Sequence, residues 1–156
     1  MTSGLPELLR GVAESDAAAI LSLGSRVHLQ SGAVLFSLGD NADTLFLVER
    51  GRVALTLPLQ VGGRDEDVLV EERQPGQTVG WSALIPPHRF TLKATALVET
   101  ELLGLSRAAL LDYFATRPEA GHAVTRNLAA VIGQRLQVFQ AMWLREVQRV
   151  VDHRSA

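Results

Sequence analysis

Residues 76–96 combine backbone turns, a hydroxyl group and nearby cations in one short segment, and this pattern favours an anion-binding turn. Gly76 and Gly80 allow backbone turns at which a side chain would clash. Residues 82–85 predict one helical turn that ends before a pair of prolines. The free N–H groups at the start of a helical turn favour negative charge. A phosphate group is therefore the ligand that this segment is expected to suit.

Three basic side chains, His88, Arg89 and Lys93, follow this turn. Arg89 is the best candidate for a phosphate contact, because a planar guanidinium can donate two parallel hydrogen bonds. We expect His88 to be a surface or hydrogen-bonded histidine, and Lys93 to face solvent from its strand. An ordinary turn followed by a solvated arginine is the alternative interpretation of the same residues.

The residue types exclude several other kinds of chemistry. The chain of 156 residues has no cysteine, which removes disulfides, thiol catalysis and cysteine-ligated metal sites. The histidines are scattered without metal-ligand spacing, and no nucleophile–base pair or carboxylate pair can be placed in one pocket. We therefore expect neither a metal site nor a cofactor nor an enzyme. The four histidines are His28, His88, His122 and His153.

Charge and hydropathy indicate a cytoplasmic protein of bacterial type. The net charge is −2 at pH 7, so the chain has no strong electrostatic footprint for nucleic acid. Hydrophobic residues make up 47% of the chain, yet no apolar run approaches the length of a membrane span. The N-terminal residues lack the basic and apolar regions of a signal peptide. Direct nucleic-acid and membrane partners are therefore not expected.

Hydrophobic periodicity predicts helices followed by strands. Residues 6–24 carry Ala and Leu at helical spacing, with Ser15 and Asp16 as the predicted N-cap and Gly24 as the predicted end. Residues 25–105 alternate apolar and polar side chains and are broken by turn residues about every eight to twelve positions. Residues 62–67 predict an exposed hairpin tip, with the return strand at 68–70. This pattern indicates an antiparallel sandwich or barrel.

Helical spacing returns over residues 106–151. Ser106 is the predicted N-cap of a first helix, and Pro118 begins a much longer one that ends near Asp152. A helix of about thirty residues is about 45 Å long, more than a β-domain of this size can cover. One part of its apolar stripe must pack on its own β-domain, and the remainder predicts a homodimer with a two-fold interface. The predicted dimer residues are Leu128, Ile132, Leu136, Phe139, Met142, Trp143 and Val147.

The order of these elements resembles the cyclic nucleotide-binding domains of the catabolite activator (Crp/Fnr) regulators and of protein kinase A regulatory subunits. The resemblance extends over residues 21–150 and is carried by residues 39–53, 74–80, 94–105 and 134–139. It implies an antiparallel double-stranded β-helix, that is, a β-roll of the jelly-roll type, mainly β, with N-terminal helices and a long C-terminal helix. On this basis residues 1–156 form one domain. Residues 25–105 are its roll, and residues 76–96 are its phosphate cassette.

The cassette departs from the family pattern at two positions. In the family, a glutamate holds the ribose hydroxyl and an arginine pairs with the cyclic phosphate. Trp81 occupies the glutamate position, His88 occupies the arginine position, and Arg89 lies one place later. Loss of a charge-assisted hydrogen bond costs about 1.5–3 kcal/mol, or on the order of ten- to a hundred-fold in affinity.

The resemblance implies ligand-binding residues at two ends of the site, the phosphate end and the base end. At the base end, Phe139 stands where the family has threonine and Gln140 where it has serine, so Phe139 is expected to stack on a base or to fill the pocket. The nominated cassette residues are Gly80, Trp81, Ser82, Ala83, Leu84, His88, Arg89 and Thr91.

The implied function is that of a stand-alone regulatory module. It is expected to bind cAMP, cGMP or another phosphate-bearing small molecule, and to signal through its C-terminal helix to an unidentified protein partner. The chain stops a few residues past that helix, without the DNA-binding winged helix of the Crp/Fnr regulators. The alternative is a ligand-blind module for dimerisation or partner binding, in which Trp81 and Phe139 fill the cavity.

Overall fold

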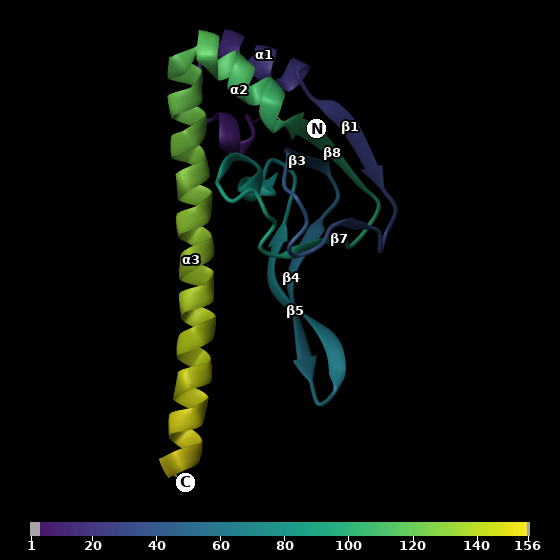
Figure 1. Cartoon of the computed structure of the whole chain (residues 1–156), viewed down its shortest axis with the longest axis vertical. Coiled ribbons are helices and arrows are strands. Elements are labelled where there is room, and N and C mark those ends of the chain that lie inside the picture. The colour runs from purple at the N-terminus through teal and green to yellow at the C-terminus, as the bar shows by residue number, and fades with distance from the viewer. Residues whose placement is uncertain (1–3, 156) are drawn as a thin grey trace.

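The computed structural model describes residues 4–155, and its elements run in the predicted order (Figure 1). A short 3₁₀ helix η1 (Glu7–Leu9) and helix α1 (Glu14–Ser22) precede the strands, and helices α2 (Arg107–Thr116) and α3 (Pro118–Ser155) follow them. A second 3₁₀ helix, η2 (Trp81–Leu84), lies between strands β6 and β7. The strands are β1 (Ser25–Leu29), β2 (Val34–Phe36), β3 (Thr44–Arg50), β4 (Val53–Val61), β5 (Arg64–Arg73), β6 (Thr78–Val79), β7 (Lys93–Ala96) and β8 (Thr100–Ser106).

The strands form two four-stranded sheets in which each pair is antiparallel, so the predicted β-roll is confirmed. One sheet has the order β1-β8-β3-β6, and the other has the order β2-β7-β4-β5. The alternation of apolar residues explains why the sheets face each other, because successive strand residues point to opposite faces. Leu45 and Leu47 of β3, for example, are buried with Leu102 of β8 and Leu55 of β4 in one core.

Two glycines show why the predicted turns need this residue. Gly51, between β3 and β4, has φ 97°, and a Cβ there would come within 2.8 Å of the Thr100 Cα. Gly80, which precedes η2, has φ 87°, and its Cβ would lie 3.1 Å from the Phe90 ring. Both turns therefore exclude a side chain by backbone conformation and by close approach.

Some of the predicted element ends differ in the structure. Ser106 does cap α2 as predicted, since its hydroxyl accepts a hydrogen bond from the Ala109 N–H at 3.1 Å. The predicted cap at Ser15 and Asp16 is wrong, because α1 already begins at Glu14. The return strand of the hairpin begins at Arg64 rather than at residue 68, because the backbone ladder with β4 continues to the glycine turn.

The Asp16 side chain turns inward and ties α1 to the junction of α2 and α3. It accepts hydrogen bonds from the Tyr113 hydroxyl at 2.5 Å and from Arg117 Nε at 2.9 Å. These hydrogen bonds hold the pKa of the Asp16 carboxyl below its ordinary value of 3.8, although burial raises it. The hydrogen bond from Arg117 lowers the pKa most. The carboxylate is thus a tertiary contact instead of a helix cap.

Asp16→Asn should remove a pH-dependent part of the stability. Because the pKa of Asp16 is lower in the folded protein, its contribution is complete above the ordinary value and is lost as the pH falls through the folded value. We expect the difference in melting temperature between the parent and Asp16→Asn to be largest near pH 7 and to shrink below about pH 4. Thermal unfolding from pH 2.5 to 7 by circular dichroism measures it. A difference that stays constant with pH would contradict the assignment.

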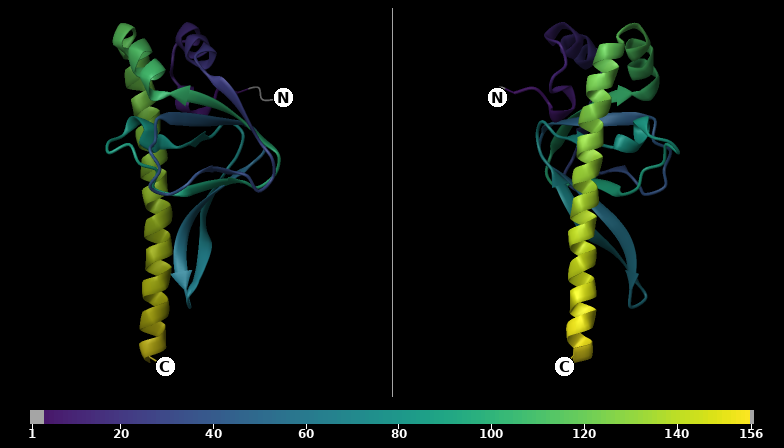
Figure 2. Two further views of the ribbon diagram at one scale, coloured as in Figure 1. Left: turned by 45° about the vertical axis from the view of Figure 1, so that its right-hand side comes forward. Right: turned by 90° about the vertical axis from the view of Figure 1, so that its left-hand side faces the viewer.

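Helix α3 is the longest element and extends well beyond the roll (Figure 2). Its 38 residues make it about 57 Å long. The first part of α3 buries Ala120, Val124, Leu128 and Val131 against the domain. The last part runs past the tip of the β4–β5 hairpin, where the roll no longer covers it. No helix within residues 4–155 combines the length and the apolar character that a membrane span requires.

Candidate functional site

The helical turn predicted for residues 82–85 is present as η2, and it starts one residue earlier, at Trp81. Gly80 takes a left-handed conformation that turns the chain from β6 into η2, and the Ile85 N–H closes this turn on the Ser82 carbonyl at 3.2 Å. Ser82 and Ala83 are buried in η2. The segment then passes Pro86 and Pro87 and reaches β7 through Phe90.

A small cleft lies between this turn, the inner face of the roll and α3. Four of the predicted cassette residues line it, namely Gly80, Trp81, Ser82 and Thr91. Its other lining residues are Phe36, Leu55, Phe90, Leu92 and Arg135. The cleft volume is about 10 Å³, which is room for about one water molecule.

Aromatic packing explains why the cleft is so narrow. The rings of Phe36 and Phe90 stack with centroids 3.6 Å apart and planes 6° apart. Trp81 is partly buried against the same core. A nucleotide-sized ligand therefore requires these side chains, or the helix beside them, to move.

The remaining predicted cassette residues do not line the cleft. Ala83 is fully buried in the core, and Leu84 packs against it. The His88 ring is held by the Ser82 carbonyl, 3.2 Å from Nδ1. Arg89 is exposed, and its Nη1 donates to the Gly39 carbonyl at 3.1 Å. The cation predicted for the anion contact thus binds the loop before β3 and does not line the cleft.

The two base-end residues are on α3 but do not line the cleft either. Phe139 is half-buried and packs against the domain core, while Gln140 is exposed. Both therefore lie where the roll begins to cover α3 less completely.

The predicted dimer residues fall into groups with different surroundings. Leu128 is 1% exposed inside its own domain, so its assignment to a dimer interface is wrong. Ile132, Phe139 and Met142 are partly buried against the roll. The exposed members of the stripe are Leu136 (68%), Trp143 (65%) and Val147 (38%). The stripe divides because the roll covers the first half of α3 and leaves the second half open.

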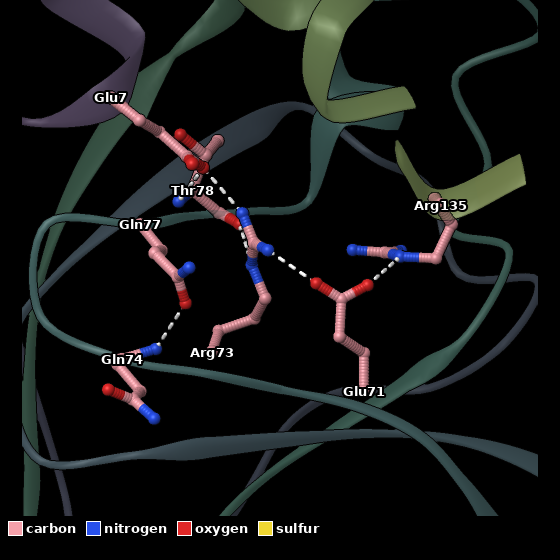
Figure 3. A network of polar contacts seen from close by, with 7 residues as sticks. All are labelled: Glu7, Glu71, Arg73, Gln74, Gln77, Thr78 and Arg135. Carbon is pink, nitrogen blue, oxygen red and sulfur yellow. Dashed lines mark hydrogen bonds and ion pairs between the residues drawn. The ribbon is translucent and has the colours of Figure 1, made fainter. Parts of the chain in front are cut away.

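A network of buried arginines and partly buried carboxylates connects the cleft to the N-terminal segment (Figure 3). Arg135 Nε donates to one oxygen of Glu71 at 2.7 Å, and Arg73 Nη1 donates to the other at 2.5 Å. Arg73 also donates to the Thr78 carbonyl at 2.9 Å and pairs with Glu7. Arg73 is only 2% exposed, so the network lies inside the protein.

The carboxylate at the centre of this network is held in its charged form. Burial raises the pKa of Glu71, but the hydrogen bond from Arg135 and the charges of both arginines outweigh it and leave the pKa below 4.5. At neutral pH, Glu71 is therefore a negative group shared between a strand residue and a helix residue.

Arg135 is the charged residue of the cleft, and the sequence-based prediction missed it. The available signal was helical spacing, since Arg135 lies four residues after Val131 and four before Phe139, on the face of α3 that packs inward. Sequence alone does not show which neighbours such a buried arginine meets. No group of three or more acidic or histidine side chains in residues 4–155 is arranged to hold a metal ion.

Comparison with known proteins agrees with this geometry. The family model for the cyclic nucleotide-binding domain matches residues 26–117. The chain is 30% identical over 130 residues to the cyclic AMP receptor protein of Thermus thermophilus, which covers 83% of this chain and 57% of that protein. It is 29% identical over 138 residues to glutaminase 1 of Bradyrhizobium diazoefficiens, which covers 86% of this chain and 21% of the enzyme.

A solved structure gives the same result at the level of the fold. The N-terminal domain of a transcriptional regulator from Streptomyces coelicolor A3(2) superposes with a TM-score of 0.69 at 28% identity, covering 84% of this chain and 89% of that one. The chain spans about half the length of the cyclic AMP receptor protein and about a fifth of the glutaminase. The two-sheet β-roll with its long C-terminal helix is thus the fold of these relatives, and the chain belongs to the cyclic nucleotide-binding domain family.

Proposed function

We propose that this chain is a regulatory sensor module for a cyclic nucleotide or another phosphate-bearing small molecule, and that it signals through α3. The observation that carries the proposal is that one cleft is lined by both the cassette turn and the long helix, through Trp81 and Ser82 on one side and Arg135 on the other. A ligand that enters this cleft must touch α3. The match to a cyclic AMP receptor protein supports a ligand of this class.

The narrow cleft implies that binding and helix movement are coupled. A volume of about 10 Å³ admits no nucleotide, so the ligand selects an arrangement in which α3 has shifted away from the cassette. The ligand can change the free-energy difference between the two arrangements only by as much as its binding free energies to them differ. The exposed end of α3 then transmits the change to a second copy of the chain and to a protein partner, in the cytoplasm.

Cyclic nucleotides should raise the melting temperature of the protein. A ligand at a hundred times its Kd stabilises the folded state by about 2.7 kcal/mol. Thermal shift and titration calorimetry with cAMP and cGMP measure this, with linear AMP as the matched control for nucleotide binding of any kind. Absence of heat and of any shift at millimolar concentration of every nucleotide tested would refute the sensor proposal.

A ligand-blind module for dimerisation or partner binding is the second candidate. The stacked rings of Phe36 and Phe90, together with Trp81 in place of the family glutamate, favour it because they fill the cleft. In that case no nucleotide changes the protein, whereas the dimer persists. Clear binding of any cyclic nucleotide would exclude this candidate.

A further inference from the structure

Arg135 is the one charged side chain among the residues that line the cleft. Its side chain is 8% exposed, and its Nε is bound to Glu71. Within residues 4–155, its two terminal amino groups have no hydrogen-bond partner, and neither is sealed from solvent. The wall of the cleft therefore contains a guanidinium that is more than nine-tenths buried and has N–H donors available for a ligand.

Arg89 does not offer the same opportunity. It lies outside the cleft, is exposed, and donates to the Gly39 carbonyl. An anion beside Arg89 would remain in water, where charge pairing is worth little, whereas an anion beside Arg135 would be largely desolvated.

We propose that Arg135, rather than Arg89, receives the anionic group of the ligand in this cleft, and that Glu71 is the internal carboxylate which this anion displaces from Arg135. The inference rests on the proposed sensor function and names the residue that performs it. A guanidinium suits a phosphate as well as a carboxylate, because both accept parallel hydrogen bonds from it.

The exchange leaves no buried charge unpaired. When an anion takes Arg135, the Glu71 carboxylate keeps its hydrogen bond from Arg73 at 2.5 Å. Arg73 is in turn held by Glu7 and by the Thr78 carbonyl. The unpaired buried charge that makes the breaking of such pairs costly is therefore avoided. Because Arg135 belongs to α3 and Glu71 to β5, the same exchange loosens the helix from the roll.

A fluorescence titration tests this proposal, because it detects binding inside the cleft. The chain has two tryptophans, so in a Trp143→Phe background Trp81 reports on the cleft by its fluorescence. The probes are cAMP, cGMP and inorganic pyrophosphate, the last of which isolates the anion from the base. The variants are Glu71→Gln, Arg135→Gln and Arg135→Lys, with Arg89→Gln as the matched control.

We expect Glu71→Gln to tighten binding by about fivefold or more, because the competing charge is gone, and Arg135→Gln to weaken it by about tenfold or more. Arg135→Lys should retain part of the affinity, since the charge remains without the planar fork. Arg89→Gln should stay within about twofold of the parent. Thermal unfolding shows that each variant is folded.

Other outcomes separate the two proposals. If Arg89→Gln abolishes binding and Arg135→Gln does not, the sensor function stands and the assignment of Arg135 is overturned. If Glu71→Gln leaves affinity unchanged, Glu71 is not the competitor. If neither the parent nor Glu71→Gln binds any probe, the sensor function fails and the role of Arg135 fails with it.

Discussion

Trp143→Glu should convert the protein from a dimer into a monomer. Trp143 is 65% exposed on the part of α3 that the roll does not cover, with Leu136 (68%), Val147 (38%) and Val150 (51%) on the same helix. Leu136, Trp143 and Val150 are spaced by seven residues, and Val147 lies four after Trp143, which is the repeat of a two-helix seam. A second copy of α3 is therefore the partner that this stripe fits.

The expected effect is large because of symmetry. In a two-fold interface each substitution is present in both subunits. Trp143→Glu therefore removes two aromatic anchors and brings two like charges together. Loss of one such anchor costs about 2 kcal/mol or more, or about thirtyfold in the dissociation constant, before the repulsion is counted. Sedimentation equilibrium at micromolar concentration measures the change.

Leu111→Glu is the matched control for this substitution. Leu111 is also exposed (53%) but belongs to α2, at the opposite end of the molecule from the free half of α3 (Figure 1). We expect this variant to remain dimeric. A parent protein that sediments as a monomer, or a Trp143→Glu variant that remains a dimer, would refute the helix interface.

Arg73→Met should be the most destabilising single substitution in the charge network. The side chain is 2% exposed and serves Glu7, Glu71 and the Thr78 carbonyl together. Its removal leaves the partly buried Glu7 carboxylate (17% exposed) without a cation, and breaking a largely buried pair in this way costs about 3–5 kcal/mol. For a chain of this size we expect a fall in melting temperature of roughly 6–20 °C.

Two further variants show whether burial causes this loss. Arg52→Met removes a surface pair with Glu72, in which the side chains are 48% and 36% exposed, and should cost less than about 1 kcal/mol. Glu7→Gln added to Arg73→Met should recover part of the stability, because the unpaired carboxylate is then neutral. Denaturant unfolding gives the free energies. Equal losses for Arg52→Met and Arg73→Met would contradict the argument.

The features that sequence predicted well depend on local physics. Alternation of apolar residues indicated the strands because a pleated chain buries every second side chain. Ser106 was identified as a cap because its hydroxyl meets an N–H three residues later. Gly80 marked the cassette turn because its left-handed backbone excludes side chains.

The features that sequence missed depend on contacts between distant segments. Arg89 looked like the anion contact because it follows the turn directly, yet its partner is the Gly39 carbonyl, fifty residues earlier in the chain. Asp16 looked like a cap, yet it is bound by Arg117, which lies 101 residues later. Leu128 belonged to a continuous apolar stripe, and only the position of the roll shows that its own domain covers it.

The sequence by itself thus determined the order of the elements and the position of the turn before β7, because periodicity, capping and turn chemistry act within a few residues, and its resemblance to a known family indicated the fold. The tertiary structure decided which cation reaches the cleft. Arg135, Glu71 and Arg73 come from α3 and β5, and Glu7 comes from η1, and only the packing of the helix on the roll brings them into one network. The strength of a charge depends on burial and on its partners, and neither can be read from the spacing of residues along the chain.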